Sequence, residues 1–567
     1  MRYHVLATDY DGTLAKDERV DNQIIESLKR LKASGRKLIL VTGRELEDLQ
    51  RLFPEHVLFD RIVAENGALI YRPATLEERT LGERPPDLFI QTLNDLHIQP
   101  LSIGRVIVST WEPHQNAVLD TIKSIGLEYQ VIFNKGAVMV LPPGINKAKG
   151  LHEALKELTI SEHNTVAIGD AENDNAMLQS VECAVAVDNA LDLVKATADW
   201  TTTHHHGAGV AELIDALVDD DLASLDVQLE RHYLKLGQCA DGTDFKISPY
   251  GNSILLSGTS GSGKTTFTAA FLEKLMAKQY QYCLIDPEGD YLDLPEVLTI
   301  GDTKQPPLIE QVIKLLTQSI QHAVVCTLAI PLDDRPVFFK KLLAAVIDLR
   351  KNTGHPHFII MDEAHHLVPA TADDSFFNFP EDFKNFFAIT TKPELVHAQF
   401  LKRVNTAVLM GEAPDQYLGD FGRITNQKIE VSANVVLQQG EVLIWQKETG
   451  KTRLVRGDMP ATLLHRHKHK YAAGDMGPDS FYFRGADENL NLKANNLMTF
   501  IQMAEGVDDE TWLFHLHRTD YSKWFGDFVN DDDLALRTSQ IEDKEKDAGR
   551  SRQAIIQLIR ERYTAPA

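Results

Sequence analysis

The feature that most constrains this chain is the run Gly-Thr-Ser-Gly-Ser-Gly-Lys-Thr at residues 258–265. It follows an apolar stretch at 252–257 and precedes apolar residues at helical spacing, from Phe267 to Leu275. A Gly-x₄-Gly-Lys-Thr sequence between a strand and a helix forms a loop whose backbone N–H groups surround phosphate oxygens. The sequence therefore predicts an α/β unit with a nucleoside triphosphate site at this loop.

Side chains near the loop supply the expected chemistry. Lys264 is expected to bind the β- and γ-phosphate oxygens, and Thr265 to ligate Mg²⁺. A second apolar stretch, 358–361, ends in Asp362 and Glu363. We expect Asp362 to reach the metal through water and Glu363 to polarise the attacking water, which favours ATP hydrolysis over transfer to a substrate. The predicted ATP-binding residues are Gly258, Thr259, Ser260, Gly261, Ser262, Gly263, Lys264, Thr265, Thr266 and Asp362.

The amino-terminal end carries a second candidate site. The apolar run 3–8 ends in Asp9-Tyr10-Asp11-Gly12. Ligands of open α/β sheets bind at the carboxyl ends of the strands, where these two carboxylates would lie. Asp9 has the chemistry to attack phosphorus, and Asp11 to move a proton. Taken alone, the motif also fits a plain Asp-Gly turn.

Three later strand ends decide between these interpretations. The strand 37–41 ends in Thr42-Gly43-Arg44, Lys147 follows an inserted block, and the strand 165–168 precedes Asp170 and Asp174. This ordered set resembles the haloacid dehalogenase (HAD) superfamily of phosphotransferases over residues 1 to about 215. The chain resembles the subclass IIB (Cof-like) phosphatases in where the block is inserted. It also shares with them the motifs Glu-Asn-Gly-Ala at 65–68 and Gly-Asp-Ala-Glu-Asn-Asp at 169–174. The short insertion resembles that of phosphoglycolate and sugar-phosphate phosphatases.

The resemblance implies a role for each residue. Asp9 would form an aspartyl-phosphate, and Asp11 would protonate the leaving oxygen and later activate water. Thr42 and Lys147 would hold the transferred phosphoryl group. The predicted Mg²⁺ ligands of the phosphatase site are Asp9, the Asp11 carbonyl, Asp170 and Asp174, although Asp174 could instead position Lys147. At the P-loop the predicted Mg²⁺ ligand is Thr265. The residues predicted to face the substrate of the phosphatase are Gly43, Arg44, Asn66 and Asn173.

The second unit also resembles a known family. The Asp-Gly hairpin at 236–247, the phrase Asp-Pro-Glu-Gly-Asp-Tyr at 286–291 and Asp-Glu-Ala-His at 362–365 together resemble the HerA/FtsK-like ATPases of the additional-strand, RecA-like class. This resemblance implies a ring, such as a hexamer, and many such ATPases move DNA. A strand at 387–392 would carry a polar sensor, where Thr391-Lys392 departs from the usual glutamine. Arg453 and Arg456 stay open as arginine fingers or surface arginines.

The expected fold class is α/β, with a Rossmann-like HAD core, an inserted α/β cap, a RecA-like P-loop unit and a small, mainly helical end. The acidic run 219–221 predicts the solvated start of a connector helix. The histidines at 204–206 fit a surface loop better than a metal tract. The expected domains are 1–215 (phosphatase, with the cap at about 75–142), 216–235 (connector), 236–460 (ATPase) and 461–567 (helical domain of unknown function).

Composition narrows the partners and the compartment. The net charge of −24 opposes non-specific binding to nucleic acid or anionic membrane. The basic cluster 464–471 leaves a local phosphate or nucleic-acid contact open, although a solvated segment explains it better. The four cysteines form no Cys-x-x-Cys pair, which argues against a disulfide framework and a zinc site. With no signal peptide and no long apolar run, the expected compartment is the cytoplasm.

The sequence thus predicts a bifunctional, Mg²⁺-dependent phosphohydrolase that binds a small phosphorylated substrate and ATP. It also predicts a homo-oligomer and no membrane partner. Three alternatives stay open. One is an ATP-driven motor acting on nucleic acid, and another is an end-processing enzyme that pairs a kinase with a phosphatase. The third is a signalling or defence scaffold that ATP assembles.

Overall fold

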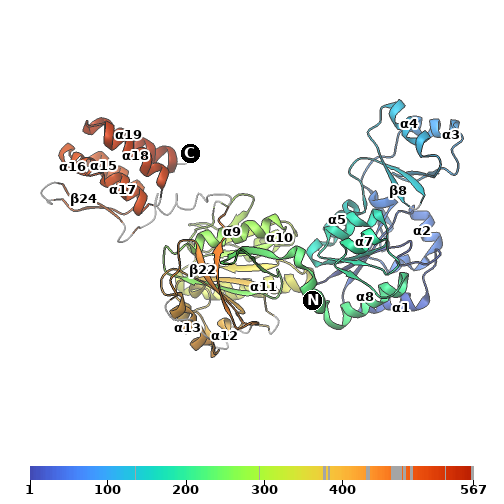
Figure 1. Ribbon diagram of the computed structural model, residues 1–567, viewed down its shortest axis with the longest axis horizontal. Helices are drawn as coiled ribbons and strands as arrows, with labels where there is room; N and C mark the ends of the chain where they lie inside the picture. The colour runs from blue at the N-terminus through green and yellow to red at the C-terminus, as the bar shows by residue number, and fades with distance from the viewer. Residues whose placement is uncertain are drawn as a thin grey trace.

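The computed structural model describes residues 1–134, 136–292, 294–373, 379–380, 383–429, 435–460, 476, 480–485, 490–529 and 531–563. The basic cluster at 464–471 lies outside the described residues. The described residues form two large sheets, a small inserted sheet and a helical unit (Figure 1). In the described part of the chain, no helix combines the length and apolarity needed to cross a bilayer.

The first large sheet is built from short apolar runs, which suit strands buried on both faces. Its order is β12-β11-β10-β1-β2-β3-β4-β5, parallel from β12 to β3 and antiparallel at β4 and β5. The strands are β1 (Val5–Asp9), β2 (Lys37–Val41), β3 (Arg61–Ala64), β4 (Leu69–Arg72), β5 (Glu77–Thr80), β10 (Thr165–Gly169), β11 (Cys183–Ala186) and β12 (Trp200–Thr201); the helices are α1 (Asn22–Ala33), α2 (Leu46–Leu52), α5 (Lys147–Leu158), α6 (Asn175–Ser180), α7 (Asp192–Thr197) and α8 (His206–Asp220).

The inserted cap has its own small sheet and core, visible as the light blue part of Figure 1. Its strands run in the order β6-β7-β9-β8. Strand β5, which the sequence-based boundary near residue 75 would place in the cap, pairs with β4 in the main sheet. The cap elements are α3 (Asp87–Asp95), β6 (Ser102–Ile103), β7 (Val108–Trp111), α4 (Gln115–Ile125), β8 (Gln130–Asn134) and β9 (Ala137–Leu141).

The acidic run at 219–221 was predicted wrongly as the start of a helix. Instead, α8 ends at Asp220, because Asp221 and Leu222 adopt left-handed backbone angles (φ 57° and 60°). Two short 3₁₀ turns, η5 (Ala223–Gln228) and η6 (Glu230–His232), replace the expected connector helix and lead directly into the next sheet.

The second large sheet has the order β14-β13-β23-β22-β21-β15-β20-β19-β16-β18-β17. Strand β20 lies between β15, which precedes the P-loop, and β19, which precedes Asp362. This is the additional-strand topology expected from the sequence. The strands are β13 (Leu234–Cys239), β14 (Asp244–Ile247), β15 (Ser253–Gly258), β16 (Tyr282–Asp286), β17 (Leu298–Ile300), β18 (Ala323–Cys326), β19 (Phe358–Met361), β20 (Phe386–Thr390), β21 (Thr406–Met410), β22 (Glu441–Gln446) and β23 (Thr452–Gly457); the helices are α9 (Lys264–Ala277), α10 (Ile309–Leu316), α11 (Arg335–Thr353), α12 (Ala398–Leu401) and α13 (Pro414–Thr425).

The last unit is mainly helical, as expected, and its core is aromatic. Trp512 stacks on Tyr521 with ring centroids 4.4 Å apart, and Trp512 donates to Ser551. Phe481 and Phe500 extend the same core. The elements are β24 (Phe481–Phe483), β25 (Leu492–Ala494), α15 (Leu497–Gly506), α16 (Asp509–His517), α17 (Asp520–Asp527), α18 (Asp532–Lys544) and α19 (Ala548–Tyr563).

All four cysteines are free. Three of them are buried in strands, Cys183 in β11, Cys283 in β16 and Cys326 in β18. Cys239, at the end of β13, is only half-buried.

Candidate active sites

A buried carboxylate cluster lies at the carboxyl edge of the first sheet. Asp9 is the last residue of β1, Asp170 follows β10, and Asp174 ends the short turn after it. Each is at most 3% exposed, and one carboxylate oxygen from each lies within 4.8 Å of the others. The adjacent parallel pairing of β1 and β10 brings the two predicted motifs together.

Lys147 connects two of these carboxylates. As the first residue of α5, it places its ammonium 2.5 Å from Asp9 Oδ1 and 2.6 Å from Asp174 Oδ1. The other Asp174 oxygen accepts the backbone N–H groups of Asp170 and Ala171, each at 3.0 Å. Asp174 therefore contacts both Lys147 and the loop that carries Asp170, while its predicted role, to position Lys147 or to support the metal, stays a prediction.

The charges in this cluster depend on one another. Burial raises the pKa of Asp9 well above its usual range, and Asp174 adds to that rise while Lys147 opposes it. Burial by itself would lower the pKa of Lys147, but Asp174 and Asp9 outweigh it and raise that pKa. The ammonium thus stays charged in a buried site, where it can offset the charge of a bound phosphoryl group.

The cluster fits Mg²⁺, which prefers hard oxygen ligands. Asp9 and Asp170 offer buried carboxylate oxygens, and Thr13 Oγ1 donates to Asp170 Oδ1 at 3.0 Å, which fixes its orientation. The Asp174 oxygens already accept hydrogen bonds from Lys147 and from two backbone N–H groups. We therefore expect Asp9 and Asp170 to bind the metal directly, with Asp174 supporting them.

Asp11 faces a cavity of about 730 Å³ between the core and the cap, which Asp9, Arg44 and Lys147 also line. The Arg44 guanidinium holds the Asp11 carboxylate with two hydrogen bonds, at 2.7 and 2.8 Å. A carboxylate held at the mouth of a cavity beside Asp9 is placed to exchange a proton with a leaving group. Arg44 thus lies beside the predicted acid and the substrate space.

The remaining predicted substrate residues also meet here. Asn173 donates to Asn66 Oδ1 at 3.1 Å, although 107 residues separate them. Asn66 Nδ2 and Asn173 Oδ1 are buried without a hydrogen-bond partner, and Asn173 lines the cavity. Thr42 is fully buried directly after β2, and Gly43 lines the cavity.

Sequence reasoning missed the role of Glu65. Its fully buried carboxylate accepts the backbone N–H groups of Arg105, Val106 and Ile107, at 2.8 to 2.9 Å, and so ties the core to the cap. The sequence places Glu65 in the Glu-Asn-Gly-Ala motif at 65–68, but nothing local indicates its partners in the cap.

The second site lies at the carboxyl edge of the second sheet, where the P-loop links β15 to α9. Gly261 and Gly263 have φ of 78° and 93°, which favour glycine. A Cβ on Gly258 would lie 2.4 Å from the Met410 carbonyl oxygen, so the loop requires glycine there as well. Lys264 Nζ donates to the carbonyl oxygens of Gly258 and Thr259, at 3.0 and 2.9 Å.

Glu363, which the sequence predicts to polarise the attacking water, lies in an environment that raises its pKa. Burial, followed by the charge of Glu288, raises its pKa to about 7, while Lys264 opposes the rise. A pKa near the working pH suits a group that accepts a proton from water. His365 Nδ1 lies 3.3 Å from Glu363 Oε2. The buried Asp362 precedes it at the end of β19, on the same edge as Thr265 and Thr266 at the start of α9.

The loop Asp-Pro-Glu-Gly-Asp-Tyr at 286–291 is organised by the carboxylate of its first residue, Asp286. The buried Asp286 carboxylate accepts four backbone N–H groups, from residues 288–291. It thereby shapes the loop that brings Glu288 close to Glu363. At the end of β20 the buried polar group beside His365 is Thr390, one residue before the position expected for a sensor.

A cavity of about 740 Å³ opens beside the P-loop, lined by residues 259–262, 411–413 and 435–441. Its size suits a nucleotide. Arg453 and Arg456 are exposed on β23, so they stay candidates for contacts with another copy of the chain.

The described residues hold one further cluster with metal-ligand types, His163, Glu182 and His232. Arg2 already pairs with Glu182 at 2.6 Å, so this carboxylate has a cationic partner without a metal ion. The histidine tract at 204–206 forms no such cluster among the described residues. His204 pairs with Glu212 and His205 with Asp188, as expected for a surface loop before α8.

These two sites define the class of protein: an aspartate-based phosphotransferase unit followed by a P-loop nucleotide-binding unit. Residues 6–111 and 94–214 match the family described as haloacid dehalogenase-like hydrolase, and residues 249–396 match an AAA domain. Phosphoglycolate phosphatase 2 of Saccharolobus solfataricus is 32% identical over 219 residues, 38% of this chain and 92% of that protein. Phosphoglycolate phosphatase 1 of the same organism is 30% identical over 230 residues, 38% of this chain and 95% of that protein.

The chain therefore belongs to the haloacid dehalogenase-like hydrolases through its first 214 residues, and it carries a P-loop ATPase unit after them. The predicted fusion of a phosphatase and an ATPase is confirmed. The match to an AAA domain does not single out the HerA/FtsK-like type, which stays a prediction.

Proposed function

We propose that this protein is a bifunctional, Mg²⁺-dependent phosphohydrolase, a phosphomonoesterase whose activity is coupled to ATP hydrolysis. The observation that carries the phosphatase proposal is the position of Lys147, whose ammonium contacts both Asp9 and Asp174 at the base of the capped cavity. Asp9, Lys147 and Asp11, proposed as nucleophile, charge partner and proton donor, line one cavity of a size that suits a small substrate.

The proposed reaction uses this chain's own side chains in two steps. Asp9 attacks the phosphorus of the monoester while Asp11, protonated and released from its pair with Arg44, gives its proton to the leaving oxygen. Asp11 then takes a proton from the water that attacks the aspartyl-phosphate, which releases phosphate and restores Asp9. Thr42 and Lys147 hold the phosphoryl oxygens throughout. Mg²⁺, bound by Asp9, Asp170 and the Asp11 carbonyl, would offset charge on the phosphoryl group.

The proposed substrate is a small phosphorylated metabolite. The cap closes a cavity that Gly43, Arg44 and Asn173 line. We propose that these three residues, with Asn66 beside Asn173, contact the substrate. The relatives named as phosphoglycolate phosphatases make phosphoglycolate one candidate, and sugar phosphates are the other.

For the second unit we propose ATP as ligand and hydrolysis as reaction, with Mg²⁺ held by Thr265 and, through water, by Asp362. Glu363 supports hydrolysis because its raised pKa suits a base that activates water. We propose that the ATPase units assemble into a homo-oligomer, in which Arg453 or Arg456 of one copy reaches the nucleotide of the next. The free cysteines support the cytoplasm as the compartment.

The test of the phosphatase is a release assay over phosphoglycolate, sugar phosphates and nucleotides, with Mg²⁺ and with or without ATP. We expect Asp9→Asn to abolish turnover and Asp17→Asn, the same change at an exposed aspartate a few residues on, to retain it. Activity that survives Asp9→Asn would overturn the assigned nucleophile. Glu363→Gln should stop ATP hydrolysis but not ATP binding, whereas Glu394→Gln, at an exposed site, should change neither.

A further inference from the structure

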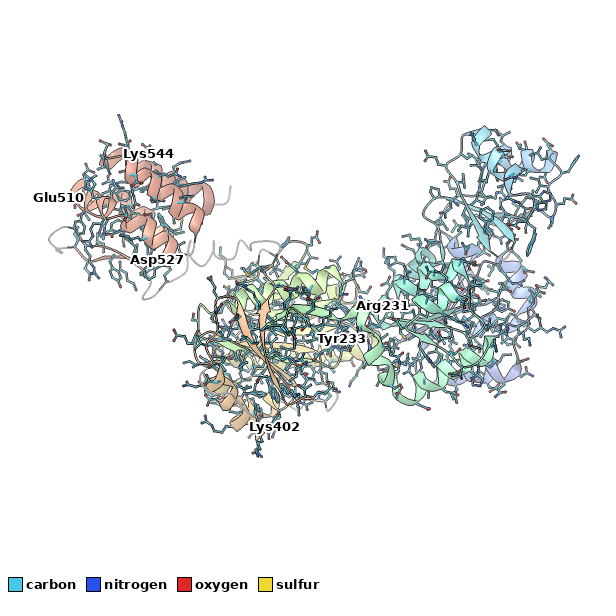
Figure 2. All side chains as sticks on the ribbon, viewed as in Figure 1. Arg231, Tyr233, Lys402, Glu510, Asp527 and Lys544 are labelled. Carbon is cyan, nitrogen blue, oxygen red and sulfur yellow. The ribbon has the colours of Figure 1, made fainter. Side chains whose placement is uncertain are left out.

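The two large sheet units meet at a buried polar interface, which we call the junction. Figure 1 shows the amino terminus there, and Figure 2 labels Arg231 and Tyr233 of the connector beside it. The junction residues are Arg2, Thr159, His163, Asn164 and Glu182 from the phosphatase unit, and Tyr250, Lys278, Tyr280, His355 and His357 from the ATPase unit.

Glu182 is the centre of the junction and is fully buried. Its carboxylate accepts from Arg2 and His163 of its own unit, each at 2.6 Å, and from the Tyr280 hydroxyl of the other unit at 2.8 Å. A buried carboxylate is stable only with such partners. Burial by itself would raise the pKa of Glu182, but His163 and Arg2 hold it well below its usual range.

His163 links the two units directly. Its Nδ1 lies 2.6 Å from Glu182 Oε2 and its Nε2 lies 2.6 Å from the Lys278 carbonyl oxygen. Both contacts are hydrogen bonds only when the ring carries both N–H groups. The same ring stacks on Tyr280 with centroids 3.8 Å apart. The two units thus share one charged group whose neighbours are fixed on every side.

Further contacts fix the orientation of the units. The Tyr250 hydroxyl donates to the His163 carbonyl oxygen at 2.8 Å, and the Arg2 guanidinium lies 3.8 Å above the Tyr250 ring. His357 Nε2 lies 3.1 Å from Asn164 Oδ1. A buried network with this many matched partners defines one arrangement of the two units, unlike a flexible tether.

The junction joins the amino ends of the strands of both sheets. Asn164 directly precedes β10 and Glu182 precedes β11, whereas His357 precedes β19. Both phosphate sites lie at the opposite, carboxyl ends of these same sheets. The two sites therefore face away from each other, separated by two strand lengths, about 30 Å, plus the junction. A phosphorylated ligand cannot pass directly from one site to the other within one chain.

One continuous line of elements connects the two sites through the junction. Helix α9 begins with the P-loop Lys264 and is followed by Lys278, whose carbonyl oxygen contacts His163. From His163 the chain enters β10, which ends beside Asp170. A shift of α9 along its axis would therefore act first on His163 and then on the strand that carries Asp170.

We propose that nucleotide bound at the P-loop controls the phosphatase through this junction, by moving α9 against His163 and β10, and that the two sites never exchange a ligand. This inference rests on the coupling proposed above and assigns its route. The Tyr250 hydroxyl, on the His163 carbonyl oxygen, and the Tyr280 hydroxyl, on the Glu182 oxygen that contacts His163, hold His163 in this route, and a change to Phe removes each of them.

The test compares the phosphatase rate of the full chain with no nucleotide, with ADP and with a non-hydrolysable ATP analogue. In the wild type we expect a nucleotide effect of at least about fivefold. Tyr250→Phe combined with Tyr280→Phe should reduce it to less than twofold and leave the nucleotide-free rate and the nucleotide affinity unchanged. Tyr233→Phe is the matched control, because its hydroxyl donates within the connector, to Asp226, and it should keep the full effect.

Distinct outcomes separate this inference from the function on which it rests. If nucleotide leaves the wild-type rate unchanged, the proposed coupling fails. If the wild type responds and the double variant responds equally, coupling stands and the junction route is overturned. Should the double variant fold poorly, hydrogen exchange of the wild type decides: the analogue should change protection at residues 160–169, and unchanged protection there overturns the route. Lys264→Ala should abolish that change.

Discussion

At the scale of single residues, the phosphatase site depends on a buried lysine. Lys147 is 2% exposed and is held between two buried carboxylates, Asp9 and Asp174. Removing one partner of a buried ionic group is strongly destabilising, since the remaining charges lose their compensation. Lys147 is therefore a structural and a chemical requirement at once.

We predict that Lys147→Met lowers the free energy of unfolding of the phosphatase unit by about 3–5 kcal/mol and its turnover by at least about 100-fold. Denaturant unfolding and a phosphate-release assay measure the two effects. Lys149→Met is the control, because Lys149 lies on the same helix, is exposed and pairs only at the surface with Glu153. Similar losses in both variants would contradict the assigned role.

Glu363 makes stability depend on pH in the absence of metal. Burial raises its pKa from 4.5 to about 7, so the folded chain binds the proton more tightly than the unfolded chain. The free energy of unfolding should therefore fall as pH rises through this range, by about 3 kcal/mol from this group. Unfolding of the ATPase unit, followed in a chelator from pH 5 to pH 8, measures it.

Glu363→Gln should lack this contribution to the pH dependence, because an amide does not titrate in this range. Glu394→Gln, at an exposed glutamate of the same unit, should retain it. Equal slopes in all three proteins would show that the Glu363 carboxyl is not shifted.

Motif residues could be predicted from the sequence, whereas residues with distant partners could not. Asp9, Thr42, Lys147 and Asp170 each lie at or after the end of a strand in a characteristic order, and the structure brings Asp9, Lys147 and Asp170 together. Glu182 gave no such signal, because its carboxylate pairs with Arg2 and accepts a hydrogen bond from Tyr280, which lie 180 and 98 residues away. Only the folded chain brings these three groups together.

At the scale of elements, local sequence predicted most helices and strands but not where one helix ends. The apolar spacing of α1 matches its buried residues, Ile24, Ile25, Leu28 and Leu31. The end of α8 depends instead on Asp221, whose carboxylate binds Arg2 and Arg36 from distant parts of the chain. Tertiary contacts thus overrode the helical tendency of the connector.

The turn after β3 packs closely against the start of α5, which carries Lys147. A Cβ on Gly67 would lie 1.9 Å from the Asn146 carbonyl oxygen, next to Lys147. We predict that Gly67→Ala displaces the start of α5 and reduces phosphatase turnover at least about tenfold. Gly35→Ala is the control: Gly35 also has positive φ, but its Cβ would meet nothing within 4 Å.

The Gly35→Ala control separates the backbone strain of an alanine at positive φ from the steric contact between its Cβ and Asn146. Gly35→Ala carries only the backbone strain of about 1–2 kcal/mol, and its turnover should be unchanged. Thermal unfolding and phosphate release measure both variants. Full turnover in Gly67→Ala would show that the contact with Asn146 is not needed to position Lys147.

At the scale of the whole molecule, charge separates the proposed enzyme from a motor that moves DNA. The chain has 82 acidic and 58 basic residues, and this excess repels a phosphate backbone. We predict that duplex DNA changes the ATP hydrolysis rate by less than twofold at physiological salt. A stimulation that falls steeply with added salt would instead favour the nucleic-acid alternative.

The placement of the cysteines has a practical consequence for studies of the junction. Burial raises the pKa of the Cys183, Cys283 and Cys326 thiols, so these sulfurs resist alkylation in the folded chain. Cys239, half-buried at the end of β13, is the accessible one. A maleimide fluorophore would therefore attach at a single position of the unmodified protein, on the ATPase side of the connector, where its emission can report movement between the two units in solution.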